Sequence, residues 1–187
     1  MTVRQLAAPP RGDAGQRAFR RAAGCFPTGV TVVTTQTAEG PWGTTVGSFV
    51  SLSLDPLLVL VSLGRGSRLR AALSSGHPFV VNVLAADQER TARHFTGRDR
   101  LPGEPGFEGI AGYPAPALGG RALTGARAVF ECRVVDLHRA GDHDLVVGEV
   151  LWFDHDDARD PLVFVDSGYR TTGGVQPPST TAPTKEH

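Results

Sequence analysis

Small and hydroxyl-bearing residues are concentrated at residues 42–53 of this 187-residue chain, in a run that otherwise has the composition of a β-strand. The run is Trp-Gly-Thr-Thr-Val-Gly-Ser-Phe-Val-Ser-Leu-Ser. A purely structural strand normally fills its buried face with large side chains, whereas Gly, Ser and Thr leave space and expose N–H and O–H donors. The pattern therefore favours either a site for an anionic or carbonyl-rich ligand or an edge strand with a solvated polar face.

A second candidate site is the loop Gly-Arg-Gly-Ser-Arg at residues 64–68, which follows an apolar strand and precedes a short helix predicted over residues 69–74. Its N–H groups and its arginines would favour a bound phosphate. Loops of this composition more often only turn the chain, so both interpretations stay open.

Histidine and aspartate are frequent in the second half of the chain, which raises the question of a metal site. The residues concerned are His138, Asp142, His143, Asp144, His155, Asp156 and Asp157. No pair has the helical i, i+4 spacing of zinc ligands, so no metal site is predicted. His143 lies beside Asp142 on a tight turn, where an imidazole could project over a barrel mouth and titrate near neutral pH. An exposed turn histidine is the simpler interpretation.

Several function classes are excluded by what the sequence lacks. There is no Gly-x-Ser-x-Gly nucleophile elbow and no Gly-x-Gly-x-x-Gly dinucleotide motif. Basic and acidic residues number 19 each, which argues against binding to nucleic acid or a membrane surface by bulk charge. Cys25 and Cys132 match no metal or redox spacing and are predicted to be free thiols in a reducing compartment. With no apolar leader and no apolar span, a cytoplasmic location is predicted.

Strand-forming runs separated by turns occupy most of the chain. Strands are predicted at residues 30–37, within 42–53, and at 57–63, 79–84, 126–138, 144–153 and 162–165. Residues 57–63 are apolar throughout and are predicted to be buried on both faces. Residues 19–26 carry Phe and Ala at helical spacing, and a second helix is predicted from Asp87 to Phe95. Residues 96–125 are predicted to be a long loop packed over the sheet.

Hairpins with few helices in a chain of this size predict a mainly β fold, a closed antiparallel barrel with short helices. One domain is expected over residues 13–172. A flexible N-terminal arm is expected over residues 1–12, and a disordered tail over residues 173–187.

Three segments, in this order along the chain, resemble the short-chain flavin reductases, the small reductase components of two-component flavin-dependent monooxygenases. They are Phe-Pro-Thr-Gly-Val-Thr-Val-Val-Thr-Thr at residues 26–35, Gly-Thr-Thr-Val-Gly-Ser-Phe-Val-Ser-Leu-Ser-Leu-Asp-Pro at 43–56, and Gly-Asp-His at 141–143. Phe-Val-Val-Asn-Val-Leu at 79–84, Gln88, Phe95 and Pro-Leu-Val-Phe at 161–164 follow in the family's order.

The resemblance implies an FMN-binding split β-barrel of the Greek-key type, usually a homodimer. It implies an enzyme that uses NADH or NADPH to reduce free FMN or FAD, and that supplies the reduced flavin to a separate monooxygenase. It implies no nucleic-acid or membrane partner.

The resemblance also implies contacts for both cofactors. The flavin ring and ribityl chain would lie against residues 43–53, where the expected contacts are Thr45, Val46, Gly47, Ser48 and Ser51. Thr28 and Val30 would lie beside the ring. The phosphate end would be held by Ser62, Ser67 and Arg68, with Phe95 near the ribityl phosphate or adenylate. His143 would be the catalytic residue at the nicotinamide, with Asp142 shaping its turn and Tyr169 nearby.

The sequence departs from the family pattern at two positions. The family often has two serines where Gly47 and Ser48 stand, which removes one side-chain hydrogen bond and leaves the backbone N–H. Leu57 replaces a frequent second proline. Two other functions stay open: a flavoprotein of the same barrel that holds its flavin and acts on its own small substrate, and a non-catalytic flavin-binding or electron-transfer module.

Overall fold

The computed structural model describes residues 11–97 and 99–173. The predicted N-terminal arm and C-terminal tail fall almost entirely outside these residues. All strand pairs in the described part of the chain are antiparallel. The prediction of a mainly β, antiparallel fold with few helices is therefore confirmed.

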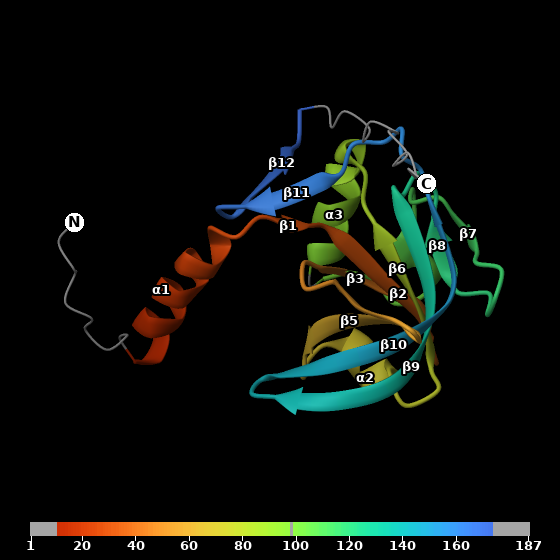
Figure 1. Cartoon of the computed structure of the whole chain (residues 1–187), viewed down its shortest axis with the longest axis horizontal. Helices are drawn as coiled ribbons and strands as arrows, with labels where there is room; N and C mark the ends of the chain where they lie inside the picture. Colours follow the sequence, from red (N-terminus) through yellow and green to blue (C-terminus); the bar gives the residue numbers. More distant parts are fainter. Residues whose placement is uncertain (1–10, 98, 174–187) are drawn as a thin grey trace, which may run out of the picture.

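Seven strands form the main sheet, in the order β3-β2-β6-β9-β10-β5-β4 (Figure 1). They are β2 Thr31–Thr37, β3 Gly40–Val46, β4 Val50–Leu54, β5 Leu57–Gly64, β6 Pro78–Val83, β9 Ala128–Ala140 and β10 His143–His155. The two edge strands, β3 and β4, are consecutive in the chain and are joined only by residues 47–49. Because so short a segment links opposite edges, the sheet must curl until those edges approach each other.

Two small sheets complete the β structure. One has the order β1-β11-β12, formed by β1 Thr28–Gly29, β11 Leu162–Val165 and β12 Gly168–Thr171. The other is a hairpin of β7 Gly112–Pro114 and β8 Arg121–Leu123. Neither β12 nor the β7–β8 hairpin was predicted from the sequence, because all three strands are short and rich in polar residues or Gly and Pro.

The prediction that residues 57–63 are buried on both faces is wrong. Val59, Val61 and Leu63 are buried inside the curled sheet, while the residues between them are partly or fully exposed. An antiparallel sheet that curls around a core has one inner and one outer face, so successive side chains alternate even where nearly every residue is apolar. The apolar outer face of β5 is thus a surface feature of the chain.

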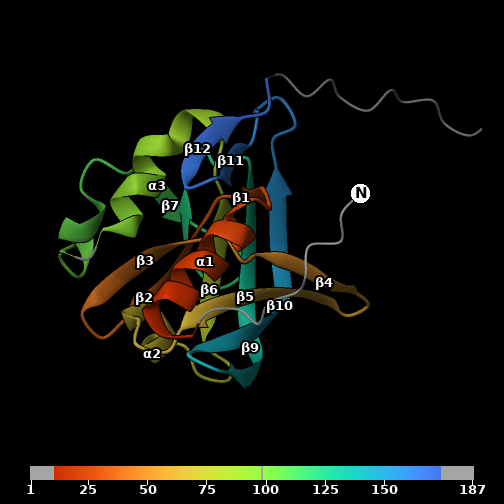
Figure 2. The ribbon, with the colours of Figure 1, turned by 90° about the vertical axis from the view of Figure 1, so that its left-hand side faces the viewer.

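The described residues also form three α-helices and two short 3-10 helices. They are α1 Gly12–Gly24, α2 Arg68–Ala72, α3 Glu89–Thr96, η1 Ala86–Gln88 and η2 Glu104–Phe107. Helix α3 packs on β3 at Gly43, where a Cβ atom would lie only 2.7 Å from the ring of Phe95. Helix α1 instead projects away from the sheets (Figures 1 and 2) and has no buried residue.

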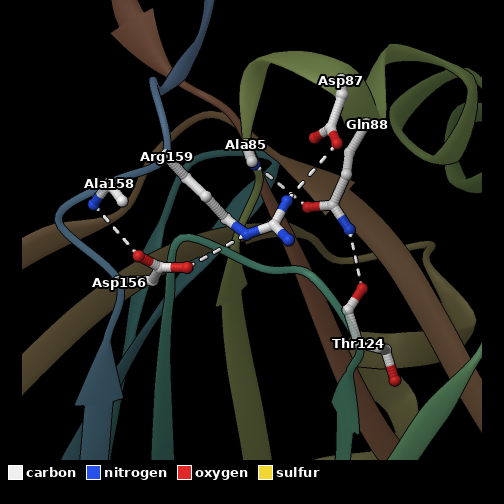
Figure 3. Close-up of polar contacts among 7 residues, drawn as sticks. All are labelled: Ala85, Asp87, Gln88, Thr124, Asp156, Ala158 and Arg159. Atoms are coloured by element: carbon white, nitrogen blue, oxygen red, sulfur yellow. Dashed lines mark hydrogen bonds and ion pairs between the residues drawn. The ribbon is translucent and has the colours of Figure 1, made fainter.

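A polar junction joins η1 to the segments before β9 and after β10 (Figure 3). The Gln88 side chain accepts the Ala85 N–H at 3.0 Å and donates to the Thr124 carbonyl at 3.0 Å. Arg159 contacts Asp87 at 3.4 Å and Asp156 at 3.2 Å. The resemblance placed Gln88 in the family's order, and the structure gives it this positioning role.

The predicted loop at residues 96–125 is held down by one buried carboxylate. Glu131 on β9 is fully buried and accepts the N–H groups of Ala117, Leu118 and Gly120 at 2.6, 2.9 and 2.9 Å. Three backbone donors on one carboxylate satisfy a charge that would otherwise be unfavourable in the interior. The loop therefore packs over the sheet as expected, although it also contains η2, β7 and β8.

Candidate functional site

Two open cavities lie along the same two strands, β3 and β5. The first, of about 600 Å³, lies where β3 passes into residues 47–50. We call it the apolar cavity; its walls include Phe26, Thr28, Gly47, Ser48, Leu60 and Ser62. The second, of about 610 Å³, is lined by the middle of β3 and by the last residue of β5. We call it the arginine cavity; its walls include Trp42, Arg65, Ser67, Arg68, Arg100 and His143.

The apolar cavity exists because β3 ends at a break. The sequence predicted one strand-like run over residues 42–53, whereas the chain leaves the sheet at residues 47–49 and re-enters it as β4. Gly47 faces Thr28 closely, since a Cβ atom at Gly47 would lie 3.2 Å from the Thr28 hydroxyl oxygen. Within residues 11–97 and 99–173, the N–H groups of Gly47 and Ser48 have no acceptor. The break thus presents two backbone donors beside an apolar wall.

Ser48 and Ser62 bind each other across the approaching edges of the sheet. The Ser48 hydroxyl oxygen accepts the Ser62 N–H at 2.8 Å, and its proton is donated to the Ser62 carbonyl at 3.0 Å. A serine hydroxyl carries one proton, so Ser48 can offer a ligand only an acceptor lone pair from its side chain. Ser48 was predicted to contact the flavin ring or ribityl chain, and Ser62 its phosphate end, but Ser62 lines the apolar cavity with Ser48 and not the arginine cavity. The first role of both residues here is to fix the break between β3 and β4.

The arginine cavity is assembled from two turns that are far apart in sequence. The loop at residues 64–68 meets the β9–β10 turn through the Arg65 N–H, which donates to the Asp142 carbonyl at 3.0 Å. Ser67 caps α2 by accepting the Arg70 N–H at 3.2 Å. The two turns therefore hold a fixed position relative to each other.

Asp144 also holds the loop at residues 64–68 against the β9–β10 turn. Its side chain is only 12% exposed and pairs with both Arg70 and, at 3.5 Å, Arg65. A nearly buried carboxylate with two guanidinium partners keeps its charge satisfied. Because Asp144 immediately follows His143 on β10, the ion pairs also fix the position of that histidine.

His143 lies at the edge of the arginine cavity with its ring oriented by Asp142. The Nδ1–H group donates to the Asp142 carboxylate at 2.8 Å, and this hydrogen bond, together with the charge of His143, lowers the pKa of Asp142 from its usual 3.8. The other ring nitrogen, Nε2, lies close to Gly64, 3.8 Å from where a Cβ atom would be. A Cβ atom at residue 64 would therefore make ordinary van der Waals contact with that nitrogen.

Sequence reasoning placed Arg68 at the phosphate end but missed Arg100, the other arginine that makes this cavity cationic. The guanidinium carbons of Arg68 and Arg100 lie 5.1 and 4.9 Å from the centre of the Trp42 ring, in cation–π geometry. Burial lowers the pKa of Arg100. Trp42 lies inside the small-residue run that drew attention to this region, but nothing local in the sequence places Arg100 beside it.

Six of the predicted contacts lie elsewhere or only behind the cavities. Val30 and Val46 are core residues. Thr45 faces α3 and donates its hydroxyl to the Ala92 carbonyl at 2.7 Å. Ser51 is exposed on β4. Phe95 is 1% exposed and lies in the wall of the arginine cavity, behind its surface. Tyr169 packs against Phe164 and under Arg93, and β12 lies at the opposite end of the molecule from the β9–β10 turn (Figures 1 and 2).

Two further features bear on function. In the described part of the chain, no helix is both long and apolar enough to cross a membrane. Among the same residues, no group of three or more His, Cys, Asp or Glu side chains is arranged to hold a metal ion. His138 pairs with Asp136 at 2.9 Å and His155 lies 3.5 Å from Asp157, so these histidines are paired with neighbours on the surface.

Comparison with known families tests the resemblance to the flavin reductases. The model of the flavin reductase-like domain matches residues 23–173, which is most of the chain. The chain belongs to the flavin reductase-like family. The resemblance drawn from three short segments is thereby confirmed, and both cavities lie within the flavin reductase-like domain.

Relatives of this flavin reductase-like protein agree in sequence and structure. It is 46% identical over 157 residues to the FMN reductase (NADH) SmoA of Agrobacterium fabrum, covering 82% of this chain and 84% of that protein. It is 36% identical over 155 residues to the reductase component of 4-hydroxyphenylacetate 3-monooxygenase from Thermus thermophilus, covering 83% and 95%. The structure of the Streptomyces globisporus NADH:FAD oxidoreductase SgcE6 with NAD and FAD fragments aligns with a TM-score of 0.80 at 33% identity, covering 95% and 99%.

Proposed function

We propose that this protein is an NADH-dependent flavin reductase that reduces free FMN or FAD and supplies the reduced flavin to a separate monooxygenase. The observation that carries the proposal is the pair of cavities along β3 and β5, one apolar with unpaired N–H donors and one with His143 and arginines. Relatives named as NADH-dependent flavin reductases and as a monooxygenase reductase component support it.

The apolar cavity fits the ring of a flavin. It combines apolar walls from Phe26 and Leu60 with a break in β3 where Gly47 carries no side chain. We assign the N–H groups of Gly47 and Ser48 to the carbonyl-rich edge of the ring, and Thr28 to its flank. When bound, a flavin supplies the group that accepts hydride from the nicotinamide. The chain itself orients the two rings and excludes water.

The arginine cavity suits a phosphate and the nicotinamide. Ser67 and Arg68 are assigned to the flavin phosphate, because both line this cavity at the end of β5. His143 is assigned to the nicotinamide, with Asp142 as the positioning residue that holds its Nδ1–H. Val30, Val46, Thr45 and Phe95 support these elements from the core and from α3, whereas Ser51 and Tyr169 lie outside both cavities in a single chain.

We further propose a split barrel, a homodimer and a cytoplasmic location. The curl of the main sheet and the Ser48–Ser62 hydrogen bonds support the barrel. A dimer is supported by two exposed apolar features, Phe19 on α1, which is 74% exposed, and Leu54 in the β4–β5 hairpin, which is 83% exposed. Two unpaired thiols, Cys25 and Cys132, suit a reducing compartment. The domain is assigned to residues 13–172.

The experiment that tests the activity is steady-state oxidation of NADH and NADPH by the purified protein, with FMN or FAD titrated from zero. We expect saturable dependence on added flavin, preference for NADH, and no turnover without flavin. Turnover supported by co-purified flavin alone would favour a flavoprotein with its own substrate. The absence of turnover in every combination would contradict the reductase and leave a flavin-binding module.

A further inference from the structure

A third cavity, of about 270 Å³, lies between the β2–β3 edge of the main sheet and the β7–β8 hairpin. None of its lining residues lines the apolar cavity or the arginine cavity, and none is assigned to a cofactor above. We call it the loop cavity; its walls include Gln36, Pro41, Glu104, Tyr113, Pro114 and Arg121.

The walls of the loop cavity are held in place by buried hydrogen bonds. The Thr34 hydroxyl donates to the Arg121 carbonyl at 2.5 Å, which ties β8 to β2. The Ala115 N–H donates to the Gly120 carbonyl at 2.7 Å, and the buried Glu131 carboxylate accepts the Gly120 N–H at 2.9 Å. The cavity is therefore preformed, as small-molecule sites usually are.

Arg121 brings to this cavity a positive charge with few acceptors. Its Nη1 group donates to both carboxylate oxygens of Glu104, at 2.8 and 2.7 Å. Over the described ranges, its Nε–H is buried without an acceptor and its Nη2 group makes no hydrogen bond. A buried donor without a partner is rare in native structures. Arg121 therefore retains donors that an anionic ligand could use.

The present partner of Arg121 is a weak competitor for such a ligand. The Glu104 side chain is 72% exposed, so water screens the ion pair. The guanidinium is oriented instead by Phe107, because its central carbon lies 4.4 Å from the centre of the Phe107 ring. The plane of the guanidinium is thus fixed whether or not Glu104 stays bound, which leaves it ready for a planar carboxylate.

The other walls indicate what kind of anion fits. Burial and the charge of Asp154 raise the pKa of Tyr113 above its usual 10, so its hydroxyl stays protonated and can donate. Pro41 and Pro114 provide apolar walls for a short carbon skeleton. The charge of Glu104 at the same site disfavours a dianion such as phosphate. These groups suit a single negative charge on a small apolar body.

We propose that the loop cavity binds a small organic monocarboxylate, held by the Arg121 guanidinium and the Tyr113 hydroxyl. The carboxylate replaces or joins Glu104 on the guanidinium, and the apolar body lies between Pro41 and Pro114. This site is separate from those assigned to the flavin and the nicotinamide. It does not depend on the proposed reductase function.

The test is isothermal titration calorimetry with benzoate as the probe, at constant ionic strength. We expect saturable binding of benzoate, and binding of the neutral analogue benzamide that is at least about tenfold weaker. Excess FMN should leave the Kd of benzoate unchanged, because the flavin is assigned to other cavities. Competition between FMN and benzoate would place benzoate in a cofactor cavity and overturn the proposal, as would the absence of benzoate binding.

Substitutions at the guanidinium and its partner locate the bound carboxylate. Arg121→Gln is expected to weaken benzoate binding about tenfold. Glu104→Gln should strengthen it, because the competing charge is removed and Arg121 gains free donors. Equal Kd values for benzoate in the wild type, Arg121→Gln and Glu104→Gln would overturn the proposal. Thermal unfolding checks that Arg121→Gln is folded, and Glu104→Gln keeps the test decisive if it is not.

Arg93 offers a matched control for the arginine substitution. It also pairs with one carboxylate, that of Glu89 at 2.7 Å, and lies over an aromatic ring, that of Tyr169. It lines none of the three cavities. Arg93→Gln should therefore leave the Kd of benzoate unchanged. A loss in Arg93→Gln as large as that in Arg121→Gln would show a general effect of surface charge and overturn the site.

Discussion

The Ser48 side chain is hydrogen-bonded twice to the backbone of Ser62, at 2.8 and 3.0 Å, and so links the end of β3 to β5. These two bonds hold open the break in which the unpaired N–H groups of Gly47 and Ser48 lie. The apolar cavity thus depends on the contact between the Ser48 side chain and the Ser62 backbone, which joins the end of β3 to β5.

Ser48→Ala is expected to weaken flavin binding and to lower the free energy of unfolding by about 1 kcal/mol, because the half-buried Ser62 N–H loses its acceptor. Flavin fluorescence titration and urea unfolding measure the two effects. Ser75→Ala, an exposed serine after α2, is the matched control and should change neither. An unchanged flavin Kd in Ser48→Ala would mean that the break does not form the ring site.

Asp144→Asn is expected to lower the free energy of unfolding by about 2 kcal/mol, because Arg70 would be left nearly buried without its carboxylate. The same change should raise the KM of NADH, since Asp144 ties the loop at residues 64–68 to the strand that begins with His143. Glu104→Gln removes an exposed partner of Arg121 and should change stability by less than about 1 kcal/mol. Equal losses in the two variants would refute the buried role of Asp144.

His143→Ala is expected to raise the KM of NADH about tenfold and the KM of flavin much less. Asp142→Asn should give part of this effect by releasing the Nδ1–H. The pKa of Asp142 lies below its usual 3.8, so the stability from its carboxylate is present above that value and is lost only as pH falls further. Mild acidification should therefore leave the Asp142 carboxylate charged. Any change that it causes in the KM of NADH should be as large in Asp142→Asn as in the wild type. Equal effects of His143→Ala on NADH and flavin would argue against a nicotinamide contact.

The two thiols should differ sharply in reactivity. Cys25 is exposed, whereas burial and the neighbouring Glu131 raise the pKa of Cys132 to about 12. A thiol reagent at about pH 8 should modify one thiol in the native protein and two after denaturation, because the thiolate is the reactive form. Cys25→Ser should abolish the native reaction. Since a raised thiol pKa gives stability that is lost above the unfolded value, alkaline destabilisation should be smaller in Cys132→Ala.

The exposed apolar side of α1 should determine the oligomeric state. Phe19→Ser is expected to shift the protein from dimer to monomer in light scattering, because it removes a large apolar contact from the proposed interface. Arg17→Ser changes the same helix on another face and serves as the control. A dimer that persists in Phe19→Ser at low micromolar concentration would remove α1 from the interface.

Local patterns in the sequence were sufficient for most of the strands. The β-branched runs gave β2, β6, β9, β10 and β11 to within a few residues, because strand composition and turn residues are local properties. Local patterns failed where the buried and exposed faces of a strand have the same composition. Residues 57–63 are apolar except for Ser62, and that one serine is too weak a pattern to distinguish the inner from the outer face of β5.

The sequence by itself determined the family, the antiparallel hairpins and the region of small residues in which a ligand could bind. Only the tertiary structure decided that Ser48 meets Ser62, that Asp144 pairs with Arg70 from 74 residues away, and that Arg68 and Arg100 lie around Trp42. Periodicity reports which face a residue takes within its own strand. The curl and register of the sheet decide which distant residues share that face, and those depend on the packing of the whole chain.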